Sequence, residues 1–281
     1  MTALINRIIN YSGVDGPGIR TVLVFQGCNF NCRYCHWPDT LGTCNGCGIC
    51  ALGCPTGALR HEAPGKTPDF FEEYCTGCGS CINACRKDAS PKIRRMSIKD
   101  ILDRLKENGK RIRGITCSGG ECMLQAEFME TLFPIVKEKG YSCLIDTNGS
   151  IDFEEQHNLL AVCDGVMLDI KAFDPQKHRE LTGWGNETAV KNAVYLARRG
   201  KLAEVRTVVT TADYGARETV GAVTRLLRPY LAVQDIRYRL IPFRVYGVRR
   251  EFRALGTPPQ AVMEDLCREA LDNGWRTVVV T

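Results

Sequence analysis

The sequence predicts an α/β fold in which six parallel strands form an incomplete barrel or an open sheet, with one small inserted domain. The first observation is that short apolar, β-branched runs alternate along the chain with segments of helical periodicity. Parallel strands need crossover connections, which are usually helices and nearly always right-handed, so this alternation implies parallel pairing. The second observation is one Cys-rich segment that interrupts the alternation. The third is the length of 281 residues, which suffices for one large barrel domain or for two ordinary domains.

Six runs have the composition of buried strands, and a last run adds a possible edge strand. The strands are expected, in chain order, at Thr21–Phe25, Ile112–Cys117, Ser142–Asp146, Gly165–Ile170, Val205–Thr210 and Ile236–Ile241, with the edge strand at Thr277–Val280. The helical patterns that separate them cover Ile98–Asn108, Gln125–Lys139, Phe153–Val162, Glu187–Arg199, Arg217–Tyr230 and Pro259–Asn273.

The interrupting segment, residues 41–91, has little helical or strand periodicity but many Cys, Gly and Pro residues. A unit this small cannot bury much apolar core, and such units are usually held together by metals or disulfides. We therefore expect an inserted domain at residues 41–91, flanked by two parts of the larger domain at residues 1–40 and 92–281.

Composition narrows the class of protein. Hydrophobic residues make up 44% of the chain and charged residues 25%, as in an ordinary globular protein. The 16 cysteines are unusual. Residues 1–12 have neither a charged start nor a continuous apolar stretch of a secretory leader, so we expect a reducing cytoplasm rather than disulfides. No apolar run approaches the roughly 18 residues that cross a bilayer, so no membrane is expected as a partner.

The formal net charge of +5 would ordinarily hint at nucleic acid as a partner. If eleven of the cysteines bind metal clusters as thiolates, they add eleven negative charges, and three cluster cores return roughly six positive ones, so the net charge becomes about zero. The basic balance therefore does not predict a nucleic-acid partner.

Three cysteines, Cys28, Cys32 and Cys35, lie close together directly after the first expected strand. A closed electron-transfer cluster takes four thiolates, so three leave one iron of a 4Fe-4S cluster open for chemistry. A zinc site or a group of inert buried thiols is the alternative. At these residues the chain resembles the radical S-adenosylmethionine (radical SAM) superfamily, whose hallmark is this spacing with an aromatic residue, here Tyr34, before the last cysteine. The resemblance implies a partial (β/α)6 TIM-type barrel.

The inserted segment contains two further cysteine runs with identical spacing, Cys44-x2-Cys47-x2-Cys50-x3-Cys54 and Cys75-x2-Cys78-x2-Cys81-x3-Cys85. Each run matches the bacterial ferredoxin pattern, in which the fourth cysteine of one run binds the cluster of the other. We expect one cluster on Cys44, Cys47, Cys50 and Cys85, and a second on Cys75, Cys78, Cys81 and Cys54. A departure from the pattern is Arg86, which stands where Pro is usual. Such clusters would relay electrons, or they would serve only as structural staples, and zinc modules are a further alternative.

Polar motifs follow three of the expected strands, where ligands of parallel α/β folds gather. They are Cys117-Ser118-Gly119-Gly120-Glu121, Asp146-Thr147-Asn148-Gly149 and Met167-Leu168-Asp169-Ile170-Lys171. Adjacent glycines let the backbone approach a ligand, and a carboxylate accepts hydrogen bonds from an ammonium group. A strand-end turn, or a buried Asp–Lys pair that only stabilises the barrel, is the competing interpretation.

These motifs, together with Val14–Gly27 before the cysteines, are similar to those of the activating enzymes of glycyl radical enzymes. The resemblance implies that Glu121 and the two glycines bind the SAM amino group and that Lys171 pairs with the SAM carboxylate. It implies a possible monovalent cation held by Asp146, Thr147, Asp169 and the carbonyl of Met167, and it places Asn148 and Arg206 beside the cofactor. This chain departs from the family's pattern at Cys122, where Pro is common, and at Arg244, where several members carry His. The match is nearest to the YjjW-type activases.

The resemblance further implies the reaction, the cofactors and the partners. SAM would be cleaved to a 5′-deoxyadenosyl radical, which abstracts hydrogen from a backbone glycine of a separate glycyl radical enzyme. The cofactors would be three 4Fe-4S clusters, one of which binds SAM, and the electron donor would be a ferredoxin or a flavodoxin. The alternatives are a radical SAM enzyme that acts on a small molecule or another peptide, and a non-catalytic multi-cluster electron carrier.

The remaining cysteines, histidines and arginines carry weaker expectations. We expect Cys143, Cys163 and Cys267 to be buried, inert thiols, and we expect no ligand role for His61, His157 or His178. His36 either modulates the neighbouring cluster or is merely exposed. The basic concentration formed by Arg237, Arg239, Arg244, Arg249, Arg250 and Arg253 is a solvated face or a docking surface for an acidic partner.

Overall fold

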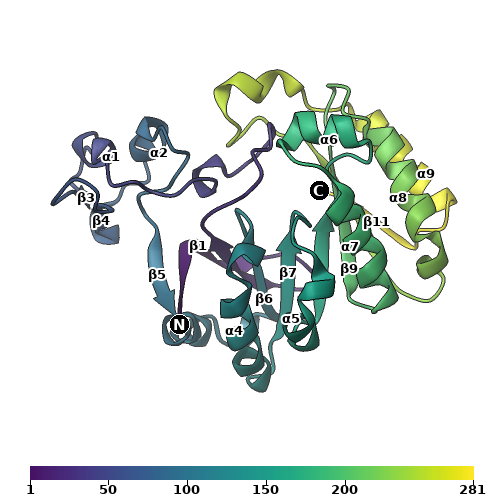
Figure 1. Cartoon of the computed structure of the whole chain (residues 1–281), viewed down its shortest axis with the longest axis horizontal. Helices are drawn as coiled ribbons and strands as arrows, with labels where there is room; N and C mark the ends of the chain where they lie inside the picture. Colours follow the sequence, from purple (N-terminus) through teal and green to yellow (C-terminus); the bar gives the residue numbers. More distant parts are fainter.

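The computed structural model describes residues 1–281 and consists of a curved nine-stranded sheet with helices along its outer face and a small lobe to one side (Figure 1). The strand order is β11-β10-β9-β8-β7-β6-β2-β1-β5. The two outermost strands, β11 and β5, do not pair with each other, so the sheet stays open. No helix is both long enough and apolar enough to cross a membrane.

The predicted parallel strands are confirmed. They are β2 (Arg20–Phe25), β6 (Gly114–Gly119), β7 (Ser142–Thr147), β8 (Gly165–Asp169), β9 (Leu202–Val209) and β10 (Arg237–Pro242), and each pairs in parallel with its neighbour. The predicted edge strand is β11 (Thr277–Val280), in parallel register with β10. Most ends differ from the prediction by one to three residues, as is usual for strand limits.

Two strands of this nine-stranded sheet were not predicted. Strand β1 (Thr2–Ser12) pairs antiparallel with β2, and β5 (Arg94–Ser97) pairs antiparallel with β1. The burial of β1 does not alternate regularly, and its register with β2 shifts twice, so its sequence lacks the period of two on which strand prediction depends. In the chain, the inserted segment lies between β2 and β5.

The helices cover the sheet between the strands. They are α3 (Ile98–Asn108), α4 (Ala126–Glu138), α5 (His157–Val162), α6 (Pro175–Thr182), α7 (Glu187–Arg198), α8 (Ala216–Leu231) and α9 (Gln260–Asp272). Helix α6 was not predicted; Asp174 caps its start and Gly183, in the left-handed conformation, ends it. The single helix expected over 153–162 is a 3-10 helix, η5 (Phe153–Glu155), followed by α5.

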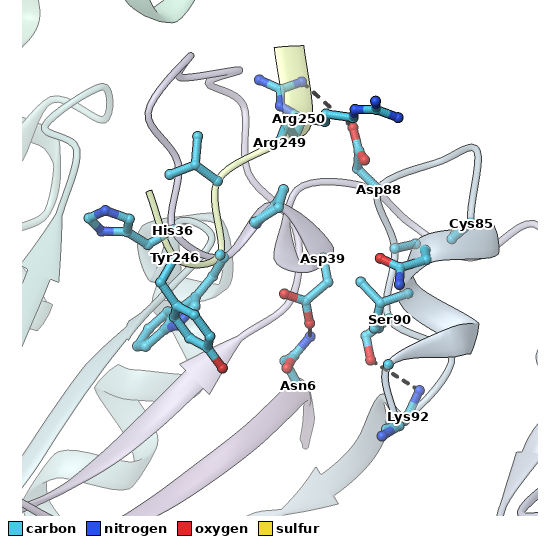
Figure 2. Close-up of a pocket in the computed structure, with 18 of the residues that line it drawn as sticks. Asn6, His36, Asp39, Cys85, Asp88, Ser90, Lys92, Tyr246, Arg249 and Arg250 are labelled. Carbon is cyan, nitrogen blue, oxygen red and sulfur yellow. Dashed lines mark hydrogen bonds and ion pairs between the residues drawn. The ribbon is translucent and has the colours of Figure 1, made fainter. Parts of the chain in front are cut away.

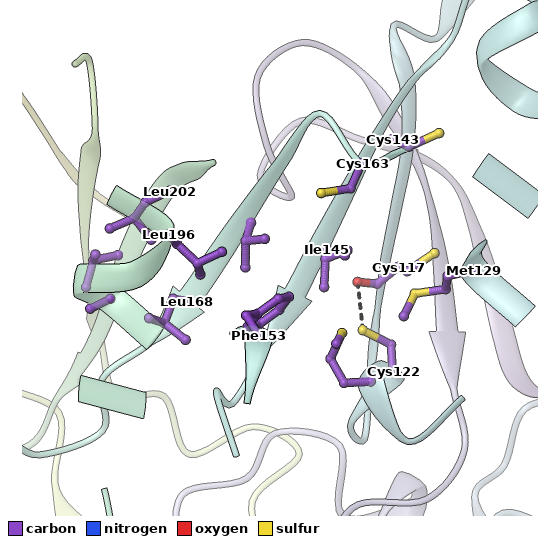
Figure 3. Packing of buried hydrophobic residues seen from close by; sticks show 14 of the residues in the cluster. Cys117, Cys122, Met129, Cys143, Ile145, Phe153, Cys163, Leu168, Leu196 and Leu202 are labelled. Carbon is purple, nitrogen blue, oxygen red and sulfur yellow. Dashed lines mark hydrogen bonds between the residues drawn. The ribbon is translucent and has the colours of Figure 1, made fainter. Parts of the chain in front are cut away.

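A core of 44 buried residues fills the space between the sheet and these helices. Figure 3 shows four of its cysteines among aliphatic and aromatic side chains: Cys117, Cys122, Cys143 and Cys163. Cys143 and Cys163 are fully buried, as expected for inert thiols, and burial raises the pKa of Cys143 to about 12 and that of Cys163 to about 11. Cys267 is half-buried and packs against the same core.

Residues 41–91 lie mostly in the side lobe, next to β5 (Figure 1). Their regular structure is limited to α1 (Ile49–Leu52), β3 (Leu59–Arg60), β4 (Asp69–Phe70), η2 (Glu72–Tyr74) and α2 (Ser80–Ala84). The buried cluster of this lobe has only three residues, Cys50, Leu59 and Cys81. The lobe therefore has almost no apolar core of its own.

Candidate functional site

A cavity of about 230 Å³ opens at the carboxyl ends of the parallel strands. The residues that line it come from the cysteine loop after β2 and from the ends of β6, β7, β8 and β9. Its lining includes nearly all the predicted site residues: Cys28, Cys32, Tyr34, Cys35, Gly119, Gly120, Asp146, Thr147, Asn148, Asp169, Lys171 and Arg206. Glu121 is the one predicted cofactor-binding residue that does not line it.

The cysteine loop is fastened to the barrel on both sides. The backbone N–H of Cys28 donates to the Leu41 carbonyl at 3.0 Å, and that of Arg33 donates to the Leu181 carbonyl in α6 at 2.9 Å. Beneath the loop, a second buried cluster of seven residues joins Cys32 and Tyr34 to apolar side chains that include Phe243. The loop therefore has a fixed place that does not depend on a bound ligand.

The three thiols are largely buried. Burial raises the pKa of Cys28 and of Cys32 to about 12, and it raises the pKa of Cys35 as well. Without a metal these groups keep their protons at neutral pH, so iron must displace the protons when it binds. Nowhere in the chain do three His, Cys, Asp or Glu side chains converge on a point that one metal ion could occupy. A cluster does not require such convergence, because each thiolate binds a different iron.

Tyr34 provides further evidence that the cavity binds a cofactor. Its hydroxyl is buried and has no hydrogen-bond partner, and burial raises its pKa. The Lys171 ammonium lies 5.8 Å from the centre of the Tyr34 ring. A buried hydroxyl without a partner on the wall of a cavity indicates a polar ligand that this structure does not contain.

Gly119 and Gly120 are required by close packing. Gly119 has φ +122°, and a Cβ there would lie 2.3 Å from the backbone nitrogen of Phe25. A Cβ on Gly120 would lie 2.2 Å from the carbonyl oxygen of Gly27, just before the cysteine loop. The two glycines thus let the end of β6 lie directly against β2 and the cysteine loop.

Glu121 lies behind the cavity wall, with 1% of its surface exposed. Its carboxylate accepts hydrogen bonds from the Thr147 hydroxyl at 2.8 Å and from the backbone N–H groups of Asn148 at 2.7 Å and Met123 at 3.0 Å. Burial raises its pKa to about 7 despite these donors. In this structure Glu121 joins the β6 turn to the end of β7.

Cys122, the departure from the family's pattern, has a structural role. Its thiol donates to the carbonyl oxygens of Cys117 at 3.4 Å and Asp146 at 3.3 Å (Figure 3 shows the first). It therefore joins the ends of β6 and β7 beneath the cavity, which a proline at this position could not do.

Asp146 is neutralised by the protein. The guanidinium of Arg206 lies 2.8 Å from its carboxylate, and the Ser118 hydroxyl donates to the same oxygen at 2.7 Å. Burial nevertheless raises the pKa of Asp146 to about 6. Nearby, Lys171 pairs with Asp169 at 2.5 Å. Arg206 and Lys171 are thus the cations next to Asp146 and Asp169. The third carboxylate of the lining, Asp15, accepts a hydrogen bond from the Ser12 hydroxyl.

Sequence reasoning missed Glu204, which lies behind Arg206. Its fully buried carboxylate binds three arginines: Arg206 at 2.5 Å, Arg239 at 2.9 Å, and Arg237. The available signal was one glutamate and three arginines at alternating positions of the segments that form β9 and β10, although Glu204 itself lies one residue before the strand predicted at Val205–Thr210. Arg237 and Arg239 therefore belong to a largely buried ionic cluster and are not part of a solvated face.

Arg249 was also not predicted as a site residue. Its guanidinium donates to the carbonyl oxygens of Asn31 at 3.3 Å and Cys32 at 3.1 Å, so it braces the cysteine loop from the far end of the chain. Of the histidines, His36 donates from Nε2 to the backbone carbonyl oxygen of Arg244 at 3.1 Å, His157 is exposed, and His178 is buried beside Phe30. His61 contacts the carbonyl of Gly46 in the lobe.

In the side lobe, the two cysteine runs have the same local backbone. Each follows the pattern Cys-x-Gly-Cys-Gly-x-Cys, and all four glycines have positive φ: Gly46, Gly48, Gly77 and Gly79. Each second glycine precedes a short helix, α1 or α2, and these two helices pack together. The lobe thus has an internal repeat. The positive-φ glycines curve the backbone of each loop, and such curvature allows a loop to surround a compact bound group.

One small cavity in the lobe is lined by Cys54, Cys75, Cys78 and Cys81, the set expected from cross-ligation. The Lys92 ammonium donates to the Cys75 sulfur at 3.2 Å. Cys85 lines a separate, wider groove. The proximity of Cys54 to the second run is a tertiary observation that spacing within either run does not contain.

Residues 22–228 match the model of the Radical SAM superfamily. The chain is 31% identical over 266 residues to a pyruvate formate-lyase-activating enzyme of Streptococcus mutans, covering 92% of this chain and 83% of the relative. It is 27% identical to a choline trimethylamine-lyase activating enzyme of Oleidesulfovibrio alaskensis, covering 90% and 87%. It is 26% identical to a 4-hydroxyphenylacetate decarboxylase activating enzyme of Clostridioides difficile, covering 98% and 95%.

Solved structures are similar in fold. QueE from Escherichia coli matches with a TM-score of 0.52 and 14% identity over 100% of this chain and 94% of QueE. Streptococcus suis SuiB bound to its precursor peptide matches with a TM-score of 0.58 and 15% identity over 92% of this chain and 48% of SuiB. At these identities the similarity concerns the fold alone.

Proposed function

Because this chain belongs to the radical SAM superfamily and, within it, to the activating enzymes of glycyl radical enzymes, we propose a role for each residue of its cavity. The enzyme is an oxidoreductase. It cleaves SAM reductively to a 5′-deoxyadenosyl radical, which abstracts hydrogen from a backbone glycine of a partner glycyl radical enzyme. The observation that carries our assignment is that three largely buried thiols, three carboxylates and two cations line one cavity at the strand ends.

Cys28, Cys32 and Cys35 would hold the 4Fe-4S cluster of the family. When bound, this cluster supplies one electron and an iron with a position open to the amino and carboxylate groups of SAM. The protein contributes the fixed loop, the dry thiol environment and the brace from Arg249. The cysteines are thus positioned before the cluster binds. The conformational entropy of the loop is lost when the barrel folds and not when the cluster binds.

We assign the SAM contacts as follows. Lys171 pairs with the SAM carboxylate, exchanging part of its contact with Asp169, and the Tyr34 hydroxyl donates to a polar atom of SAM. The backbone at Gly119 and Gly120 faces the amino group. The carboxylate oxygens of Glu121 already accept hydrogen bonds from Thr147 and Asn148. Glu121 would therefore affect the binding of the amino group indirectly, by positioning these two residues.

Arg206 and Asp146 form the charged floor of the cavity, and Glu204 holds Arg206 in place. A monovalent cation near Asp146, Thr147, Asp169 and the Met167 carbonyl stays a proposal by resemblance. The neutralisation of Asp146 by Arg206 means that such an ion would have to share this carboxylate with a guanidinium.

For the side lobe we propose a ferredoxin-like domain of residues 41–91 inserted into a radical SAM domain of residues 1–40 and 92–281. It would hold two further 4Fe-4S clusters, on Cys44, Cys47, Cys50 and Cys85, and on Cys75, Cys78, Cys81 and Cys54, as in YjjW-type activases. The shared cavity of Cys54 with the second run supports the cross-ligation. The lobe would relay electrons from a ferredoxin or a flavodoxin in a reducing cytoplasm, where thiols stay free.

The test of the activity combines anaerobically reconstituted enzyme, a reductant, SAM and a candidate glycyl radical enzyme. We expect 5′-deoxyadenosine, and the doublet of a glycyl radical in the electron paramagnetic resonance spectrum of the partner. The same mixture with Cys35→Ser enzyme should give neither. If SAM is cleaved but no plausible partner acquires the doublet, the enzyme acts on a different substrate.

The relay role has its own test. Replacing Cys44 and Cys75 by serine should leave SAM binding intact but slow multiple-turnover cleavage with a protein reductant. Unchanged turnover would mean that the lobe's clusters are structural staples.

A further inference from the structure

A wide groove of about 1380 Å³ separates the side lobe from the barrel. One wall belongs to the lobe and includes Cys78 and Cys85. The other belongs to the barrel and consists of His36 and Trp37, which follow the SAM cysteines, and of residues 244–253 from the loop after β10 and the 3-10 helix η6 (Arg250–Leu255). Figure 2 shows His36 and Tyr246 on one side, Cys85, Ser90 and Lys92 on the other, and Asp39 and Asn6 between the two sides.

The groove is positively charged. Six cationic and three acidic side chains line it, and two of the acids are already paired, Asp39 with Arg7 at 2.7 Å and Asp88 with Arg249 at 3.7 Å. The cations without a carboxylate partner are Lys92, Arg244, Arg250 and Arg253. Of the six arginines that form the basic concentration in the sequence, four therefore face this groove and two are bound to Glu204.

The rim of the groove carries exposed residues of the kind that anchor protein contacts. Tyr246 is 93% exposed and Val245 is 43% exposed. Tyrosine and arginine are enriched among residues that contribute most to binding, yet the lining as a whole is polar, with 7 hydrophobic residues among 24. Small, polar and charged contact surfaces are typical of transient redox encounters rather than of permanent complexes.

The position of the groove, next to cysteines of the lobe, indicates a partner that exchanges electrons with the lobe. Cys78 is exposed and Cys85 half-buried, and they are proposed ligands of the two different lobe clusters. A protein seated here would contact one proposed ligand of each cluster and would reach His36, which follows Cys35 in the chain. Electron transfer requires close approach to a cluster, and the groove offers that approach.

We infer that this groove is the docking site of a small acidic protein that carries single electrons. The inference rests on the proposed function, since it assumes clusters on the lobe cysteines. In the docked complex the reduced carrier loses one electron and one lobe cluster gains it, so no further reactant is needed. Charge complementarity steers the encounter, which makes association fast and sensitive to salt.

The experiment measures binding of flavodoxin, an acidic one-electron flavoprotein, to the reconstituted holoenzyme under anaerobic conditions. The test variant is Arg250→Glu/Arg253→Glu, because neither side chain contacts the SAM cavity. Its matched control is Arg225→Glu/Arg228→Glu, which makes the same charge change at two exposed arginines of α8.

At low salt we expect the test variant to raise the Kd about tenfold or more, and the control to change it by less than about twofold. The neutral variant Arg250→Gln/Arg253→Gln should lie between wild type and the test variant, and all differences should shrink at high salt. If the test and control variants bind flavodoxin equally well, the groove is not the docking site.

A second measurement separates this inference from the proposed function. With dithionite, a small reductant that needs no docking site, wild type and all variants should form 5′-deoxyadenosine at the same rate, which also shows that the variants are folded. No product from wild-type enzyme with dithionite overturns the proposed function. Equal product with dithionite, combined with unchanged flavodoxin binding in the test variant, overturns the groove inference alone.

Discussion

The barrel cavity and the side lobe both present cysteines for clusters, but they are held together in different ways. The SAM cysteine loop lies on a sheet backed by a 44-residue core and packs on a further buried cluster of seven residues. The lobe has a buried cluster of three residues, of which two are themselves cysteines. A barrel with such a core can form its cavity without metal, whereas we expect a lobe with so small a core to depend on bound metal for folding.

The largest expected effect is the loss of SAM cleavage when a cysteine of the barrel site is replaced, with almost no change in the stability of the barrel. Cys35→Ser should lower SAM cleavage by on the order of a thousandfold or more, because the open iron would no longer be held. The free energy of unfolding should change by less than about 1 kcal/mol, since the loop is held by the barrel. The measurements are 5′-deoxyadenosine formation and chemical denaturation, and Cys267→Ser on α9 is the control that should keep activity. Substantial cleavage by the Cys35 variant would show that the triplet is not the SAM site.

Removal of iron should have the opposite pattern, because it should unfold the lobe and leave the barrel folded. After chelation we expect backbone hydrogen exchange in residues 44–85 to accelerate about a hundredfold or more, because the lobe loses the ligand that organises it. Exchange in β6, β7, β8 and β9 should stay slow. Mass spectrometry of the exchanged peptides provides the readout. Lobe amides that stay protected without iron would show that the lobe folds by packing alone.

Inside the barrel, the buried charge cluster is expected to be the most sensitive point for stability. Glu204→Ala should lower the free energy of unfolding by about 3–5 kcal/mol, because it leaves three arginines without their shared carboxylate. Denaturant unfolding measures the loss. The control is Glu269→Ala, which breaks an ion pair with Arg217 on the surface and should cost less than about 1 kcal/mol. Equal losses in the two variants would mean that Glu204 does not organise the cavity floor.

The smallest expected effect is a pH dependence from Glu121. Burial raises its pKa to about 7 in the folded protein, above the ordinary value of 4.5. Between these pH values the folded state keeps a proton that the unfolded state releases, so stability falls as pH rises from about 4.5 to 7, by roughly 3 kcal/mol in total. Glu121→Gln should remove this component. Denaturation of both proteins at pH 5 and pH 8 tests it, and identical pH dependence would exclude a raised pKa.

Much of the fold could be predicted because its information is local. The six parallel strands and the edge strand have apolar, β-branched compositions, and the helices between them have clear periodicity or caps, as at Ser97 before α3. Strands β1 and β5 could not be predicted in the same way. Strand β1 lacks alternation, and β5 is four residues long and pairs only because the chain returns from the lobe.

The candidate site likewise has features that the sequence could predict and features that it could not. Spacing alone singled out the cysteines as candidate ligands, and the position of polar motifs after strands singled out Asp146, Asp169 and Lys171. These three side chains line one cavity together with the cysteine loop after β2. Spacing could not show that the Glu121 carboxylate is occupied by donors from β7, or that Arg249 reaches back to the cysteine loop. These contacts join residues that are from 26 to more than 200 positions apart.

By itself, the sequence determined which atoms are available to bind metal and which segments become strands, because ligand spacing and periodicity are properties of short stretches of chain. Only the tertiary structure decided how charge is distributed among these residues. It buried Arg237 and Arg239 against Glu204 and left Arg244, Arg250 and Arg253 facing the groove, although all five lie within a short stretch of related composition. The physical reason is that the environment of a charge depends on what packs against it, and those neighbours come from distant parts of the chain.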